Sequence, residues 1–124
     1  MTFDALEVAI QIIETLRPVL KRVKTQDRSL DDQMRRAAAS IGDNVSEARL
    51  RVGKDRIHLW RVAAGSAAEL HTSLRMAVAF GYVTTEEVQP SLALLDREKA
   101  MLWRLTHAGG SAPRGAGSRD QSSP

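Results

Sequence analysis

The chain has 124 residues, of which 43% are hydrophobic, and its formal net charge is +3. This length allows one small domain with a single core. Because the chain contains no cysteine, disulfides and thiolate chemistry are excluded and nothing requires an oxidising compartment. No stretch has the composition of a signal peptide or of a membrane span. We therefore expect a cytoplasmic protein without membrane contact.

The positive charge is concentrated in the first half of the chain. Residues 17–61 hold twelve Lys and Arg against six Asp and Glu. Such an excess attracts phosphate backbones through its long-range field and through counterion release. A run of charge is, however, also typical of a surface that only keeps a protein soluble.

Hydrophobic periodicity predicts four helices and no strand. The first helix extends from about Asp4 to Val23, and its broad apolar surface suggests burial on two sides. Pro18 lies inside it and predicts a kink or a restart near Arg17. The second helix follows a polar link over residues 24–28, begins with a capping box that starts at Ser29, and ends around residues 50–52.

The third helix is expected to begin near residues 54–55 and to end at Phe80, where Gly81 provides a left-handed stop. Its centre, residues 63–68, has little side-chain bulk, which predicts a close crossing with a neighbour. Thr84 and Glu87 form a capping box for a fourth helix that reaches about His107. The Gly/Ser/Pro-rich residues 109–124 are predicted to be a disordered tail.

Short connections between four helices predict an all-α, antiparallel up-down-up-down bundle over residues 1–108. Three stretches of the sequence resemble those of a known family. They are Leu30-x-x-Gln33-Met34-Arg35-Arg36-Ala37-Ala38-x-Ser40-Ile41-x-x-Asn44-Val45-x-Glu47, Phe3-x-x-Leu6-Glu7-Val8, and Gly65-Ser66-x-Ala68-Glu69-Leu70-x-Thr72-x-Leu74 followed by Gly81-Tyr82-Val83. Over roughly residues 3–107, they resemble the four-helix bundle family known from proteins encoded in intervening sequences of 23S ribosomal RNA.

This resemblance implies a bundle that assembles as a homopentamer, with no established catalytic activity and a suspected association with nucleic acid. A more distant resemblance is to the accessory proteins of diversity-generating retroelements. Those proteins are basic pentameric bundles that partner a reverse transcriptase and its RNA.

The polar flank of the second helix has two interpretations. Arg36, Ser40 and Asn44 could contact RNA, but Glu47 would repel a phosphate. The alternative is a buried network between the second and third helices, in which Glu69 accepts hydrogen bonds from Arg35 or Arg36 and fixes the helix register. We favour this structural interpretation, with the network formed by Arg35, Arg36, Ser40, Asn44, Glu47 and Glu69.

The better candidates for RNA contact are the cations at the end of the first helix and around the turn between the second and third helices. These residues are Arg17, Lys21, Arg22, Lys24, Arg28, Arg49, Arg51, Lys54 and Arg56. Because the second helix runs from the first place to the second, we expect two patches, which a cyclic assembly would repeat into rings. Aromatic residues are not interleaved with these cations, so sequence-specific reading of RNA is poorly supported.

Enzymatic chemistry has little support in the sequence. The spacing Asp55-x-x-His58 fits two ligands on one helix face, but a third metal ligand is not evident. We therefore expect no catalytic residue, metal, cofactor or small-molecule substrate. Trp60 and Trp103 could anchor a partner, although core positions are more common for tryptophan in a bundle.

The resulting hypothesis is a non-enzymatic homo-oligomer, a pentamer by resemblance, that offers basic patches to RNA or to a nucleic-acid-handling protein such as a reverse transcriptase. The alternative is a protein-interaction scaffold whose charge only keeps it soluble. The two hypotheses differ in salt dependence, because RNA binding weakens steeply with salt whereas a scaffold depends on apolar anchors.

Overall fold

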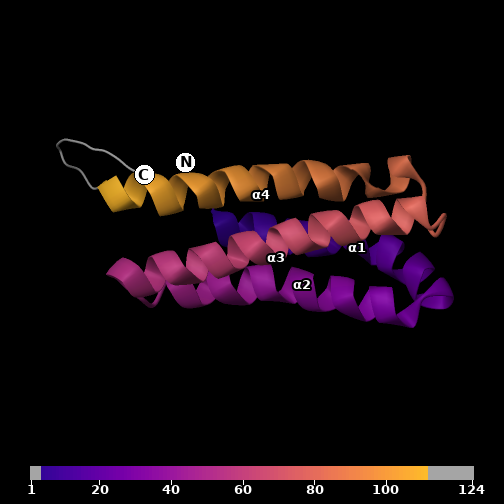
Figure 1. Ribbon diagram of the computed structural model, residues 1–124, viewed down its shortest axis with the longest axis horizontal. Helices are drawn as coiled ribbons and strands as arrows, with labels where there is room; N and C mark the ends of the chain where they lie inside the picture. Colours follow the sequence, from indigo (N-terminus) through magenta and orange to yellow (C-terminus); the bar gives the residue numbers. More distant parts are fainter. Residues whose placement is uncertain (1–3, 112–124) are drawn as a thin grey trace.

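Four antiparallel helices form an up-down-up-down bundle, which confirms the predicted fold (Figure 1). The computed structural model of the chain describes residues 4–111. The helices are α1 (Ala5–Gln26), α2 (Arg28–Ala48), α3 (Gly53–Ala79) and α4 (Thr85–Ser111). Each packs against its neighbours in the chain, and α1 also packs against α4. Within residues 4–111, no helix is both long and apolar enough to cross a bilayer.

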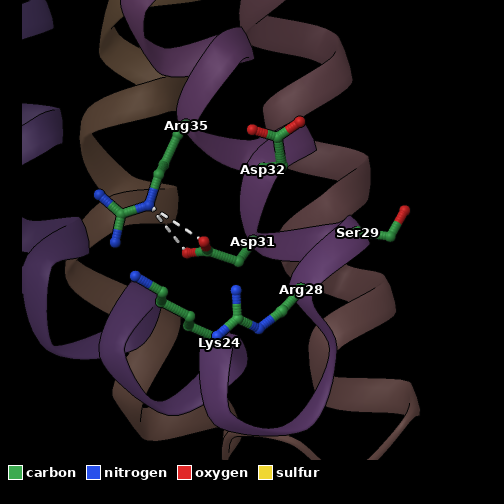
Figure 2. A pocket seen from close by; sticks show the side chains of 6 residues that line it. All are labelled: Lys24, Arg28, Ser29, Asp31, Asp32 and Arg35. Atoms are coloured by element: carbon green, nitrogen blue, oxygen red, sulfur yellow. Dashed lines mark hydrogen bonds and ion pairs between the residues drawn. The ribbon is translucent and has the colours of Figure 1, made fainter.

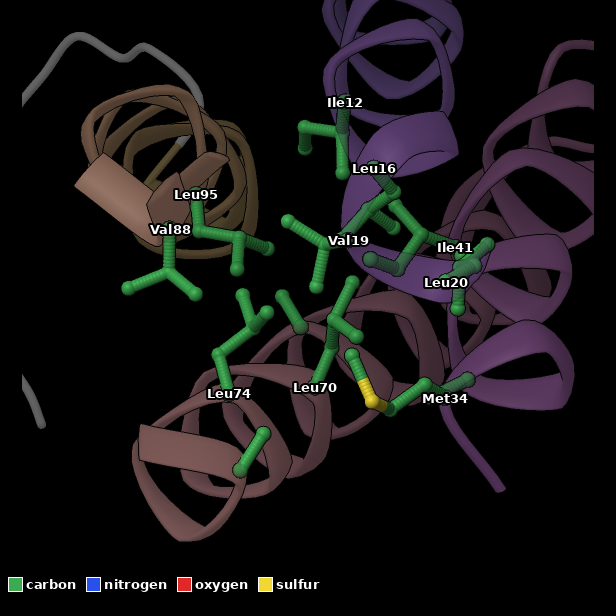
Figure 3. Packing of buried hydrophobic residues seen from close by; sticks show 14 of the residues in the cluster. Ile12, Leu16, Val19, Leu20, Met34, Ile41, Leu70, Leu74, Val88 and Leu95 are labelled. Atoms are coloured by element: carbon green, nitrogen blue, oxygen red, sulfur yellow. The ribbon is translucent and has the colours of Figure 1, made fainter. Parts of the chain in front are cut away.

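The core lies between the four helices and extends along most of the bundle (Figure 3). Ile12 and Leu16 from α1, Met34 from α2, Leu70 from α3 and Leu95 from α4 are all inaccessible to solvent. Burial of each such side chain contributes on the order of 1.5–3 kcal/mol. A smaller cluster of Ala5, Val45, Ala63 and Leu102 lies beside it. It is close to the end where α2 connects to α3.

A single residue, Asp27, connects α1 to α2. Its backbone N–H bonds to Val23 at the end of α1, and its side chain accepts from the Leu30 N–H at the start of α2, 2.9 Å away. Asp27 is therefore the N-cap of α2. The prediction of a polar link over residues 24–28 with a capping box at Ser29 is wrong, because one aspartate completes both helix ends.

The Asp27 side chain also joins this turn to the turn between α3 and α4. The Tyr82 hydroxyl donates to the second Asp27 carboxylate oxygen, at 3.0 Å. This hydrogen bond, together with partial desolvation, raises the pKa of Tyr82 above its ordinary value. Both turns of this end of the bundle are thus held by one carboxylate.

The other helix ends differ little from the predictions. α2 ends at Ala48, two residues earlier than expected, and α3 begins one residue early, at Gly53 with a φ of 60°. Gly81, with a φ of 79°, ends α3 as predicted: its N–H bonds to Val78 and the Tyr82 N–H bonds to Ala77.

The predicted capping box of α4 is confirmed. The Glu87 carboxylate accepts from the Thr84 N–H at 2.8 Å, while the Thr84 hydroxyl accepts from the Glu87 N–H at 3.2 Å. These contacts fix the start of the helix. Pro90 lies inside the helix, beyond these contacts.

Two expectations about helix continuity need correction. α1 runs through Pro18 without interruption, so a restart near Arg17 does not occur. α4 continues past His107 to Ser111, so the first residues of the predicted tail are helical. The remainder of that prediction, residues 112–124, lies outside the described residues.

The low-bulk centre of α3 contacts α2 through its alanines. Ala67 is fully buried and belongs to the same cluster as Ala37 and Ala38 of α2. A side chain added at Gly65 would meet nothing within 4 Å. The close approach therefore depends on alanine at the contact, and the glycine faces away from it.

Candidate nucleic-acid interface

The nine cations predicted to contact RNA occupy opposite ends of the bundle. Arg17, Lys21, Arg22 and Lys24 lie in the second half of α1, and Arg28 begins α2. Arg49 and the other three cations lie around the turn from α2 to α3. α2 has 21 residues, so these groups are separated by about 30 Å along its axis. We call the two places the α1–α2 end and the α2–α3 end (Figure 1).

At the α2–α3 end, three of the four cations are engaged within the chain. Arg49 pairs with Asp4 at 2.7 Å, and Arg51 pairs with Glu47 at 2.7 Å. The Arg56 guanidinium donates to the Ala48 carbonyl at 3.0 Å and lies over the Trp60 ring. Among residues 4–111, only Lys54 of this group is without such a contact. Two of the four charges are therefore offset by an acid, and the Arg56 guanidinium is occupied by a carbonyl and a ring, so this end has fewer available cations than the sequence suggests.

At the α1–α2 end, the opposite holds. Arg22 forms an ion pair with Glu87. The pKa of Glu87 is lowered, chiefly because its carboxylate accepts a hydrogen bond from the Thr84 backbone N–H, and also because of this pair with Arg22. The other four cations make no ion pair with any residue of the described range, and they are exposed. We call Arg17, Lys21, Lys24 and Arg28 the basic stripe.

The basic stripe follows from helix geometry. Residues 17, 21 and 24 are separated by four and three positions, so they share one face of α1. Arg28 continues the series after the one-residue turn at Asp27. The tight connection places the first cation of α2 next to the last cation of α1.

A pocket lies where the basic stripe meets α2 (Figure 2). It has a volume of about 630 Å³ and is lined by Lys24, Arg28, Ser29, Asp31, Asp32 and Arg35. Asp31 is buried, and its two oxygens accept from the Arg35 Nε at 3.0 and 3.1 Å. Asp32 pairs with Arg36 outside the pocket, at 3.4 Å.

The predicted polar network between α2 and α3 is largely wrong. Arg35 and Arg36 pair within their own helix, and Glu69 is exposed with no hydrogen bond or ion pair to the described part of the chain. Glu47 pairs with Arg51. Of the six predicted network residues, only Ser40 forms a hydrogen bond to α3 in the described range, between its hydroxyl and that of Ser66 at 2.6 Å.

Asn44 supports this contact within α2. Its side-chain amide donates to the Ser40 carbonyl at 2.8 Å and to the Ser40 hydroxyl at 3.1 Å. Acidic partners four residues away within α2 satisfy the arginines more readily than Glu69 can, because i,i+4 side chains are already adjacent.

Sequence reasoning missed the most unusual acid in the bundle, Glu98 of α4. Its side chain is 0% exposed, and neither carboxylate oxygen has a hydrogen-bond partner in the described residues. Desolvation, with a smaller contribution from the charge of Asp4, raises the pKa of Glu98 to about 8. The signal was present in the sequence, since Leu95 and Leu102 lie three and four positions away on the core face.

The two tryptophans differ in their surroundings. Trp60 is half-buried and packs against the smaller core cluster. Trp103 is 60% exposed and stacks on His107 with ring centroids 4.0 Å apart. No group of three or more metal-ligating side chains occurs in the part of the chain that the structure describes.

Comparison with known proteins agrees with the fold. A protein of unknown function from Bacteroides thetaiotaomicron, assigned to the S23 ribosomal protein family, has a similar structure with a TM-score of 0.70. The two chains are 21% identical, and the match covers 84% of this chain and 95% of the other. A comparison with curated proteins found no match. Residues 2–104 match the 23S rRNA-intervening sequence proteins, and the chain therefore belongs to that family.

Proposed function

We propose that this protein is a non-enzymatic homo-oligomer that binds RNA through the basic stripe. The observation that carries the proposal is the set of four exposed cations that pair with no residue of the described range, Arg17, Lys21, Lys24 and Arg28. An unneutralised cation is available to displace counterions from a phosphate backbone, whereas an arginine already paired with a carboxylate must first lose that partner.

Self-association is supported by the same face of α1. Ile10 and Ile13, one to two turns before Arg17, are 44% and 39% exposed although both are large and apolar. They share the helix face with the basic stripe, because their spacing continues its series. The exposed face of α1 is thus apolar in its first half and basic in its second. We propose that the apolar half contacts other copies of the chain and leaves the basic half accessible.

Assembly would also strengthen RNA binding. Four cations in one chain neutralise only a few phosphates, which gives weak and salt-sensitive affinity. A ring repeats the basic stripe, and binding at one copy raises the effective RNA concentration at the next. We propose five copies, the number that the resemblance to the family implies. The family's association with a ribosomal RNA intervening sequence is compatible with an RNA partner.

The test compares two double variants that remove equal charge from the two ends. Binding of a fluorescein-labelled single-stranded RNA to Arg17→Gln/Lys21→Gln and to Arg49→Gln/Arg51→Gln is measured by anisotropy at several salt concentrations. We expect the first variant to lose about tenfold or more in affinity and to have a shallower salt dependence, since each lost phosphate contact reduces the slope by about 0.7. The second should remain within about threefold of the original.

Equal losses in both variants would contradict the assignment to the α1–α2 end. Absence of binding by the unaltered protein at low salt would contradict RNA binding altogether. Circular dichroism confirms that each variant is folded. Light scattering of the unaltered protein, with and without RNA, measures the number of copies, and a monomer would contradict self-association.

A protein-interaction scaffold is the second candidate, and the exposed Trp103 favours it. Tryptophan supplies a large rigid contact surface and is enriched among residues that dominate interface energetics. Trp103 lies on α4, away from the basic stripe on α1, so the two candidate surfaces can be separated. A partner whose binding is lost in Trp103→Ala and is insensitive to salt would favour the scaffold.

A further inference from the structure

We propose that the pocket at the α1–α2 end binds a phosphate monoester, and that it thereby holds the 5′-phosphorylated end of an RNA whose next nucleotides follow the basic stripe. The inference deepens the proposed RNA binding and rests on it. It starts from the convergence of Lys24, Arg28 and Arg35 on one pocket, which these residues reach from two different helices (Figure 2).

The pocket has an excess of positive charge. Asp31 is engaged by Arg35 through both oxygens, at 3.0 and 3.1 Å, so its charge is offset within the wall of the pocket. Asp32 is offset by Arg36 on the outer side. Lys24 and Arg28 take part in none of the ion pairs of the described range. Two positive charges therefore remain.

This excess matches the charge of one particular class of ligand. A phosphate monoester carries about −1.5 to −2 near neutral pH, whereas each phosphodiester of an RNA backbone carries a single negative charge. Two uncompensated cations in one pocket thus favour a terminal phosphate over an internal one. A neutral or cationic ligand would gain nothing from them.

The side chains also have suitable donor geometry. An arginine presents a planar fork of N–H groups that fits two phosphate oxygens, and a lysine ammonium acts as a compact point charge. Arg28 and Lys24 can therefore contact different oxygens of one phosphate group. The Ser29 hydroxyl, which also lines the pocket, points away from these two cations (Figure 2).

Asp31 also lines the pocket, and a carboxylate repels a phosphate. Asp31 is buried, however, and its oxygens face Arg35, so the carboxylate holds that guanidinium at the edge of the pocket (Figure 2). Lys24 and Arg28 are exposed, whereas the Asp31 side chain is only 8% exposed. The two cations are therefore more accessible to a phosphate than the acid is.

The position of the pocket selects an RNA end as the ligand. Lys24 and Arg28 belong both to the pocket and to the basic stripe, so the two surfaces are continuous. A terminal phosphate seated in the pocket leaves the following phosphates next to Lys21 and Arg17 along α1. A free phosphate or a mononucleotide would use the pocket alone.

The experiment uses the full chain and two RNAs of identical sequence, labelled at the 3′ end, of which one carries a 5′ phosphate and the other a 5′ hydroxyl. Affinities are measured by anisotropy for the unaltered protein, for Arg28→Gln and, as a matched control with the same charge loss, for Lys21→Gln. We expect the phosphorylated RNA to bind about tenfold more tightly. Arg28→Gln should abolish most of this preference, while Lys21→Gln weakens both RNAs and preserves it.

A second measurement separates the ligand sources and does not depend on RNA binding. Inorganic phosphate is titrated against the isotope-labelled protein, and the amide chemical shifts of Lys24, Arg28 and Ser29 are followed. Shifts confined to these residues, with sulfate at equal ionic strength causing much smaller ones, support the pocket. If phosphate shifts them and the two RNAs bind equally, the monoester site is supported and its assignment to an RNA end is overturned.

The remaining outcomes distinguish this inference from the proposed function. Equal RNA affinities without phosphate shifts overturn the pocket, while salt-sensitive RNA binding still stands. Phosphate shifts without binding of either RNA overturn the proposed function and leave the pocket. Arg28→Gln must retain the circular dichroism spectrum of the unaltered protein. Lys24→Gln is the second variant if it does not, and an unchanged preference in a folded variant overturns the inference.

Discussion

The two ends of the bundle carry similar numbers of cations but use them differently. At the α2–α3 end, Arg49, Arg51 and Arg56 are each engaged by an acid or a carbonyl of the same chain. Of the five cations predicted to contact RNA at the α1–α2 end, only Arg22 has an acidic partner among residues 4–111. Counting basic residues in the sequence cannot separate these cases. Whether a cation is available to a ligand depends on which acids the fold places beside it.

The turns explain why the ends differ. The connection between α2 and α3 spans residues 49–52, and Asp4, just before α1, pairs with Arg49 in this connection. The connection between α1 and α2 has only Asp27, whose carboxylate is used by the Leu30 N–H and the Tyr82 hydroxyl. Asp27 is thus engaged by a backbone N–H and a tyrosine, and it forms no ion pair with the neighbouring cations in the described residues.

The largest expected change concerns Glu98, whose pKa is also raised by Asp4 of the α2–α3 end. Because the buried carboxyl group has no hydrogen-bond partner among the described residues, Glu98→Leu should stabilise the fold by about 1–3 kcal/mol. Urea denaturation at pH 7 measures the change. A loss of stability would show that Glu98 has a partner in the assembled protein. The polar groups near the α2–α3 end would then not all be paired within one chain.

The same residue predicts how stability depends on pH. The folded state holds the Glu98 proton up to about pH 8, whereas the unfolded chain releases it near its ordinary value of 4.5. The unfolded state is therefore favoured as pH rises through this window, and stability should fall by up to about 1.4 kcal/mol per pH unit. Glu98→Gln, which cannot titrate, is the control. Parallel pH profiles for the two proteins would contradict the raised pKa.

A substitution of Asp27 tests the contacts that hold the two turns at the α1–α2 end. Asp27→Ala removes the N-cap of α2 and the acceptor of Tyr82, so it should destabilise the fold by about 1–2 kcal/mol. Because the hydrogen bond to Asp27 is the main cause that raises the pKa of Tyr82, ultraviolet titration of this single tyrosine should show its pKa falling toward 10.0. A change in stability without a change in the tyrosine titration would confine the role of Asp27 to the cap.

The fold could be predicted from the sequence because helix periodicity and stop signals are local. Gly81 and the Thr84–Glu87 capping box are examples, since each is decided by residues within one turn. The single-residue connection at Asp27 could not be predicted, because its aspartate serves two helices and a tyrosine 55 positions away.

The candidate site was predictable only in part, for a similar reason. The sequence identified all four members of the basic stripe but could not rank them above Arg49 or Arg51. The acid that pairs with Arg49 is Asp4, 45 positions away, and only the fold brings them together. The prediction for Glu69 was wrong for the opposite reason. The sequence allowed Glu69 to pair with Arg35 across the helices, but Arg35 pairs with Asp31 on its own helix.

The smallest expected effect concerns Arg49 at the α2–α3 end. Arg49→Gln removes the ion pair with Asp4, and because both side chains are largely exposed, stability should change by less than about 1 kcal/mol. The charge of Asp4 near Glu98 is then no longer compensated by Arg49, so the pH at which stability levels off should move slightly upward. RNA affinity should barely change, because Arg49 was already neutralised. A clear loss of RNA affinity in this variant would mean that RNA competes successfully with Asp4, and the α2–α3 end would then count as a second RNA-binding surface.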